Sequence, residues 1–142
     1  MANDIEITLL AAGEYHEFQD IIPRSQEPWW LQTRSTGSRY LAGVGGDGGV
    51  YRYLIHDNRL GVRPALHIIL NTNKSFGVGK QIRIGSKSWT ILKTIETPFD
   101  EIELFVLCNE FIATRRFDPD SNDWKSSELK QWLETEGLKL IF

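Results

Sequence analysis

A glycine-rich run is the first pattern in this chain that could do chemistry. Gly43-Val44-Gly45-Gly46-Asp47-Gly48 matches GxGxxG, in which the glycines let a strand turn into a helix whose N-terminus holds a pyrophosphate. The run that follows, Val50 to Ile55, is rich in β-branched and aromatic residues and predicts a strand, so the required helix is missing. The Asp47-Gly48 pair instead favours a β-hairpin, because both residues accept the positive φ of a tight turn.

A second pattern resembles the start of a calcium-binding loop. Asp118, Asp120 and Asn122 place oxygen atoms at alternate positions, but such a loop needs Gly at its sixth position and Glu at its twelfth. Asp123 and Leu129 stand there. The segment therefore predicts a turn that leads into a helix.

The remaining candidates for catalysis are isolated. His16, His56 and His67 have no metal-type spacing, and the single cysteine, Cys108, lies in an apolar run that predicts a buried position. No nucleophile elbow, phosphate-binding loop or paired acid and base stands out. The sequence therefore predicts a protein that is not an enzyme and that uses no metal and no cofactor.

Composition narrows the choice of partner. The chain has 142 residues with a net charge of −3, and its basic residues form no dense stripe, which argues against direct binding of nucleic acid. No apolar run reaches the roughly 18 residues that span a bilayer, and the start of the chain is acidic rather than signal-like. We expect no membrane contact, and a location in the cytoplasm of a host cell or on a virion.

Tryptophan is the most informative residue type. The chain has five tryptophans, and large aromatics both anchor small cores and dominate binding hot spots. Trp89 and Trp132 are expected in the core. For Trp29 and Trp30, strand alternation predicts that one ring points inward and one outward, where it could contact a partner.

The elements that must position these residues form one domain, residues 1–142. Periodicity predicts an α+β fold with a twisted, mainly antiparallel sheet of about seven short strands and two short helices. The helices are expected at residues 11–22, ending at Pro23, and after Ser126 or Ser127, ending at Gly137. The strands are expected at residues 5–9, 39–44, 50–55, 66–70, 79–85, 88–92 and 102–108.

Several stretches together resemble a family of bacterial and phage domains of unknown function. Its signature runs WWLRSPG, then a variable hairpin with a DG turn, then GVRPAL. The chain carries Trp29-Trp30-Leu31, Asp47-Gly48 and Gly61-Val62-Arg63-Pro64-Ala65-Leu66 in that order. Its second half fits the same family through Trp89-Thr90-Ile91-Leu92 and the run from Ser126 to Leu133. The resemblance divides the domain into a WWL…GVRPAL module (1–76) and a WTIL…SELKQWL module (77–142), in reversed order.

The resemblance implies a C-type-lectin-like or formylglycine-enzyme-like fold. The redox cysteine pair of that enzyme fold is absent, because Cys108 is alone. The family arginine of WWLR is replaced by Gln32, with Arg34 two residues later. Arg63 keeps its place, and we expect it to tie loop carbonyls to the sheet.

The sequence thus predicts a non-enzymatic binding module of a phage or mobile element. Its partner is expected to be a host protein, for example a defence protein, which would make the chain an inhibitor such as an anti-CRISPR; a homo-oligomer is compatible with this. The alternative is a carbohydrate- or receptor-binding domain of a virion or cell-surface protein. The expected binding residues are Trp30, Arg34, Arg39, Tyr51 and Tyr53. The expected structural residues are Trp29, Asp47, Gly48, Arg63, Trp89 and Trp132.

Overall fold

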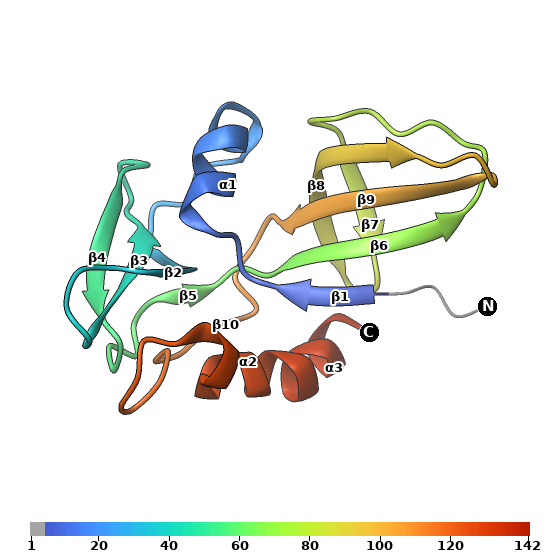
Figure 1. Ribbon diagram of the computed structural model, residues 1–142. Coiled ribbons are helices and arrows are strands. Elements are labelled where there is room, and N and C mark those ends of the chain that lie inside the picture. Colours follow the sequence, from blue (N-terminus) through green and yellow to red (C-terminus); the bar gives the residue numbers. More distant parts are fainter. Residues whose placement is uncertain (1–4) are drawn as a thin grey trace.

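The computed structural model describes residues 5–142, which form two five-stranded sheets and two helical segments (Figure 1). Sheet A consists, in spatial order, of β1 (Ile5–Thr8), β6 (Ala65–Asn71), β9 (Glu101–Cys108), β8 (Lys87–Glu96) and β7 (Gln81–Ile84). Sheet B consists of β10 (Ala113–Thr114), β5 (Gly61–Val62), β2 (Trp29–Arg34), β3 (Tyr40–Val44) and β4 (Val50–Leu54).

Neighbouring strands are antiparallel with one exception. In sheet A every pair is antiparallel, and the long β6–β9 ladder runs from Ala65 opposite Leu107 to Asn71 opposite Glu101. In sheet B only β2 and β5 are parallel. Each sheet also combines strands from both halves of the chain, since β7, β8 and β9 lie in sheet A and β10 lies in sheet B.

The chain passes from one sheet to the other inside the GVRPAL run. β5 ends at Val62 in sheet B and β6 begins at Ala65 in sheet A, so that Arg63 and Pro64 alone make the link. A proline holds the residue before it in an extended conformation, which suits a direct crossing. Arg63 is thereby fixed at the junction of the two sheets.

Two helical segments complete the fold. The first is α1 (Ala12–Phe18), continued by a 3₁₀ turn (Gln19–Ile21), and Glu14 stabilises its start by accepting the Ala11 amide at 2.8 Å. The second comprises α2 (Glu128–Trp132), a π-helical turn (Leu133–Gly137) and α3 (Leu138–Ile141), which follow one another without a break. Ser127 caps its start, because its Oγ accepts the Lys130 amide at 3.0 Å.

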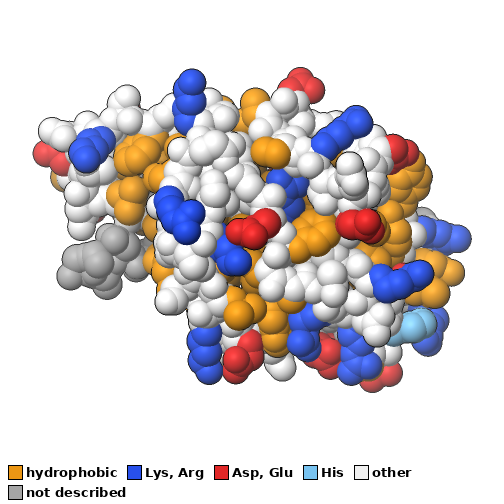
Figure 2. Space-filling view, turned by 180° about the vertical axis from the view of Figure 1, so that it is seen from behind, with side chains coloured by type: hydrophobic (Ala, Val, Ile, Leu, Met, Phe, Trp, Pro, Cys, Tyr) orange, Lys and Arg blue, Asp and Glu red, His pale blue; other side chains and the backbone are white. Residues whose placement is uncertain are grey.

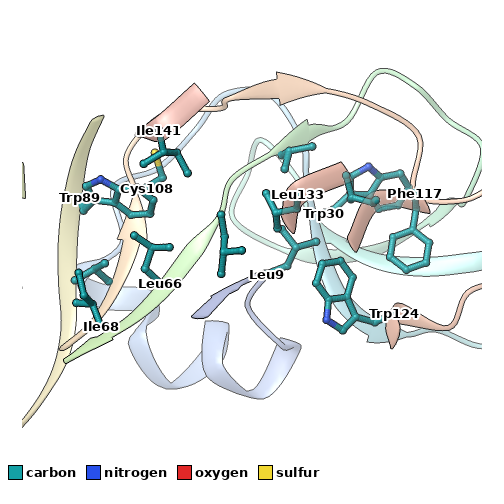
Figure 3. Packing of buried hydrophobic residues seen from close by; sticks show 14 of the residues in the cluster. Leu9, Trp30, Leu66, Ile68, Trp89, Cys108, Phe117, Trp124, Leu133 and Ile141 are labelled. Atoms are coloured by element: carbon teal, nitrogen blue, oxygen red, sulfur yellow. The ribbon is translucent and has the colours of Figure 1, made fainter. Parts of the chain in front are cut away.

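The helices lie on opposite sides of the sheets, α1 on one side and the C-terminal helix on the other (Figure 1). Alternate residues of β9 face the two sides: Leu104 and Val106 pack in the cluster that contains Leu133, whereas Phe105 and Leu107 pack in the cluster that contains Tyr15. The first cluster runs along both sheets (Figure 3). Because both faces are covered, β9 is apolar along most of its length.

The expected α+β class and the two helices are confirmed, but the strand arrangement differs from the expectation. Ten strands in two sheets replace about seven strands in one sheet. β5 and β10 have two residues each, too few for an alternating pattern. Gly137 does not end the last helix, which continues to Ile141; a Cβ on Gly137 would press against Leu133, so the glycine permits close packing instead.

Within residues 5–142, no helix combines the length and the apolar character that crossing a bilayer requires.

The segment that resembled a calcium loop is a turn that leads into the last helix. The Asp118 carboxylate accepts backbone amides of Asp120 at 2.9 Å, Ser121 at 2.8 Å and Glu128 at 2.8 Å. Burial acts to raise the pKa of this carboxyl, but the three amides outweigh it, and the net pKa is lowered. Asp118 thus connects the loop to the first turn of α2.

We expect Asp118→Ala to lower the free energy of unfolding at pH 7 by about 2 to 3 kcal/mol, because it leaves three amides without their acceptor. A lowered folded pKa means that the carboxylate stabilises the fold above the pKa of an unfolded aspartate, about 3.9, and loses this effect as the pH falls through the folded value. The difference between wild type and variant, measured by urea unfolding, should therefore shrink below about pH 4. A difference that is the same at pH 3 and pH 7 would contradict this role.

Candidate binding site

The candidate site is a cavity of about 320 Å³ beside α1, at the junction of the two sheets. It is enclosed by α1 with its 3₁₀ turn, by the connector at residues 22–25, by the turn between β3 and β4, and by the side chains of Trp29 and Arg63. In Figure 1, α1 and the β3–β4 turn project to the same side of the molecule. The Trp- and Gly-rich stretch of the chain therefore supplies much of the wall.

Arg63 is the residue with the most unusual surroundings. Its side chain lines the cavity but is only 1% exposed. Nε donates a hydrogen bond of 2.6 Å to the Cys108 carbonyl, and the guanidinium lies over the Trp29 ring, 4.9 Å from its centroid. Nη1 has no hydrogen-bond partner among the described residues. The expected hydrogen bond from Arg63 to a loop carbonyl is thus present, but it occupies only Nε of the guanidinium.

Within the described residues, the charge of Arg63 also has no counter-ion. Among residues 5–142, no carboxylate lies within 4.0 Å of its guanidinium nitrogens. Burial lowers the pKa of Arg63 to about 10, while Cys108 and Tyr15 act in the opposite direction. The side chain still carries a full positive charge at neutral pH.

Tyr15 fixes the outer wall of the cavity. Its hydroxyl donates a hydrogen bond of 2.7 Å to the Gly48 carbonyl, and its ring meets Trp29 edge-on at 5.7 Å. Burial raises the pKa of this hydroxyl, although Arg24 and Arg63 lower it. Tyr15 therefore joins α1 to the β3–β4 turn.

The β3–β4 turn is held by Asp47. Its carboxylate accepts the Gly49 amide at 2.9 Å and the Tyr51 hydroxyl. Both hydrogen bonds lower the pKa of Asp47, and the one from Tyr51 has the larger effect. Gly48 has a φ of +84°, but Asp47 does not have a positive φ, so the expectation of a turn with both residues in that region is wrong. The Gly48 amide donates to the Gly45 carbonyl at 2.9 Å, which matches a turn centred on Gly46 and Asp47 and followed by a left-handed glycine.

Arg24 supplies a second guanidinium at the cavity. It belongs to the connector after α1 and lies against Gly48, where an added Cβ would come within 3.1 Å of its Nη2. No ion pair of Arg24 is present in the described part of the chain. Asp20 is the one acidic residue in the cavity lining, so two cations face one carboxylate.

The structure does not bring the five expected binding residues into one surface. Trp30 is 0% exposed, so the expectation that one ring of the Trp29-Trp30 pair faces solvent is wrong. The two rings do point to opposite faces of β2, but α1 covers one face and the C-terminal helix the other. Tyr53 is half-buried and meets the Trp30 ring edge-on at 6.3 Å.

Arg34, Arg39 and Tyr51 reach the surface. Arg34 forms an ion pair of 3.2 Å with Asp123, a contact between the two halves of the chain. Gln32 donates hydrogen bonds to the Leu9 carbonyl at 2.7 Å and to the Thr8 hydroxyl at 3.1 Å. The neutral amide thus has a structural role of its own.

The expected structural residues lie as follows. Trp29 and Trp89 are buried, and Trp89 Nε1 donates to the Ile84 carbonyl at 3.1 Å. Trp132 is half-buried, and the Arg115 guanidinium covers its ring at 4.7 Å from the centroid.

No family model, no curated protein and no solved structure matches the chain.

Sequence reasoning missed the cavity. Its polar residues, Tyr15, Arg24, Gly48 and Arg63, are far apart in the sequence, and no spacing rule joins them. One local signal existed: Arg63 interrupts an apolar run, and a charge in such a run must either be paired or mark a site. Elsewhere in the described residues, no group of three or more His, Cys, Asp or Glu side chains is placed to hold a metal ion.

Proposed function

We propose that this protein is a non-enzymatic binding module of a phage or mobile element and that it recognises a protein of the bacterial host through β4. The observation that carries the proposal is the free edge of this strand. β4 ends sheet B, and no strand in the described part of the chain pairs with its outer edge. In Figure 1 it is the outermost strand at one end of the molecule.

The side chains around this edge are of the kinds that dominate protein interfaces. Tyr51 is 49% exposed on one face of β4, and Leu54 is 39% exposed on the other. Arg39 and Arg52 are exposed beside them. Tyrosine and arginine are enriched in binding hot spots, and an open strand edge can pair with a strand of a partner.

Two side chains at the edge are held by contacts within the chain. Tyr51 is held by its hydrogen bond to Asp47, and Arg52 lies over the Tyr40 ring at 4.3 Å from the centroid. Side chains that are already ordered lose little entropy on binding, which favours affinity. The two exposed arginines favour a partner with an acidic surface.

Charge argues against nucleic acid as the partner. On the face drawn in Figure 2, lysine and arginine side chains are spread among acidic and apolar ones rather than gathered in a stripe. We propose a host defence protein as the partner, and the host cytoplasm or the virion as the location. We further propose that the chain is a variant of the C-type-lectin-like fold, as the WWL and GVRPAL runs suggest.

A charge on the β4 edge should weaken binding of the host partner. We expect Leu54→Asp to weaken binding to the host partner at least tenfold, because a carboxylate would have to lose its water at an interface. Ile95→Asp is the matched control: Ile95 is 43% exposed and lies on β8 in the other sheet. Affinity capture from host lysate with mass spectrometry, using both variants and wild type, measures the effect.

The supporting outcome is a host protein retained by wild type and by Ile95→Asp but lost by Leu54→Asp, with its affinity then measured on purified proteins. Recovery of no host protein, or equal recovery by all three chains, would sink the proposal. Circular dichroism of the variants shows that each remains folded.

A further inference from the structure

The buried charge of Arg63 is not neutralised by any carboxylate of residues 5–142. A buried charge is costly unless it is paired and hydrogen-bonded. Arg63 is 1% exposed, Nη1 lacks any partner among the described residues, and the contacts that favour its charge there are a neutral carbonyl, that of Cys108, and the Trp29 ring. Water could complete a hydrogen bond, but only an anion would neutralise the charge.

The space for that anion lies beside Arg63. The cavity that its side chain lines measures about 320 Å³, near the lower end of the range for ligand pockets of about 300 to 1,000 Å³. Arg24 brings a second guanidinium to the same cavity, whose described lining contains the carboxylate of Asp20. Asp47, outside the lining on the β3–β4 turn, also interacts with Arg24, whereas no carboxylate of residues 5–142 forms an ion pair with Arg63. Size and charge together indicate a small anion.

The donors available to a ligand are side chains rather than the glycine-rich backbone. The Gly45 amide donates to the Gly49 carbonyl at 2.8 Å, and the Gly48 amide donates to the Gly45 carbonyl at 2.9 Å. Tyr15 donates its proton to Gly48. These backbone amides are already hydrogen-bonded, so the turn forms a wall of the cavity without donating to a ligand. The two arginines are therefore the groups that would bind a negative charge.

We propose that this cavity binds a small oxyanion, a carboxylate or a phosphate, held by Arg63 and Arg24. A guanidinium presents several N–H donors in one plane, which matches the oxygen atoms of either group. Nε of Arg63 is engaged by Cys108, so the two terminal nitrogens, Nη1 and Nη2, are the donors left for the ligand. The cavity is separate from the outer edge of β4, so anion binding is tested independently of the protein partner proposed above.

The test is titration of the purified protein with inorganic phosphate and, separately, with acetate, at constant ionic strength set with sodium chloride. We expect saturable binding by calorimetry, a rise of the melting temperature with ligand concentration, and shifts of the Gly45 and Gly48 amide signals in NMR spectra. Whichever of the two probes binds more tightly identifies the oxyanion class.

Three variants assign the residues. Arg63→Met removes the charge but keeps an unbranched side chain; the variant should fold and bind the preferred probe at least tenfold more weakly. Arg24→Met should weaken binding by a smaller factor. Arg83→Met changes an exposed arginine of β7 in the same way and should leave binding unchanged.

Absence of saturable binding of both probes to wild type overturns the proposal. Equal affinity in wild type and Arg63→Met overturns it as well. If Arg63→Met does not fold, two other measurements decide. Unchanged affinity of Arg24→Met for the preferred probe would refute the assignment. NMR shifts of wild type that occur away from the Gly45 and Gly48 amides would refute it as well.

Discussion

Replacement of Trp30 by alanine is expected to lower the free energy of unfolding by about 4 kcal/mol, a large part of the total stability of a domain of this size. The ring is completely buried, meets Tyr53 edge-on and packs against Phe117 at 5.9 Å between ring centroids. Its Nε1 donates to the Arg115 carbonyl at 2.7 Å. Alanine would open a cavity and leave that carbonyl unsatisfied.

Urea unfolding of Trp30→Ala measures this effect, and two variants calibrate it. Trp30→Phe keeps most of the ring volume but loses the hydrogen bond, so it should cost less. Trp132→Ala removes a half-buried tryptophan under Arg115 and should also cost less. A loss below about 2 kcal/mol for Trp30→Ala would show that the cluster repacks around the gap.

Gly85→Ala is expected to cost about 3 kcal/mol. Gly85 has a φ of +60°, and a Cβ there would overlap the carbonyl oxygen of Ile141. That carbonyl accepts the Ser86 amide at 2.7 Å, and the Ser86 hydroxyl donates to the Leu140 carbonyl at 2.9 Å. The variant therefore combines backbone strain of about 1 to 2 kcal/mol with displacement of the end of the last helix from the β7–β8 turn.

Gly79→Ala separates these two causes. Gly79 has a φ of +83°, but the nearest atom to an added Cβ is a methyl group of Ile21 at 3.8 Å. It should show the strain alone, about 1 to 2 kcal/mol. Equal losses in the two variants, measured by thermal unfolding, would mean that the contact between Gly85 and Ile141 contributes nothing to stability.

Much of the fold follows from local patterns. Alternation and turn residues predict β3 and β4 around Asp47-Gly48, the β7–β8 hairpin at Gly85, and the helix after Ser127. The seven expected strands leave out β2, β5 and β10. β5 and β10 have two residues each, and the pairing of Val62 with Ala113 joins residues that are far apart in the sequence. The division into two sheets was missed for the same reason: the Arg63-Pro64 link has no local signal for a change of sheet.

The candidate site could be predicted only in part. The sequence draws attention to the Trp- and Gly-rich stretch, and this stretch does supply Trp29, Gly48 and Arg63 to the cavity. It cannot show that Trp30 is covered by the C-terminal helix, because that contact joins residues far apart. It also cannot show that Arg63 lacks a carboxylate, since pairing depends on every element packed around it.

The strand order determines when the chain can fold during its synthesis. Val62 of β5 can pair only after Ala113 has been synthesised. β6, which lies between β1 and β9 in sheet A, can be fully paired only after β9 has been synthesised, with Leu66 opposite Val106. Neither sheet can be completed until most of the chain has left the ribosome. Pairing over such distances is slow, so we expect the nascent chain to expose β6 and β2 for longer than a helical protein of equal length would expose its core, and to depend on chaperones at high rates of expression.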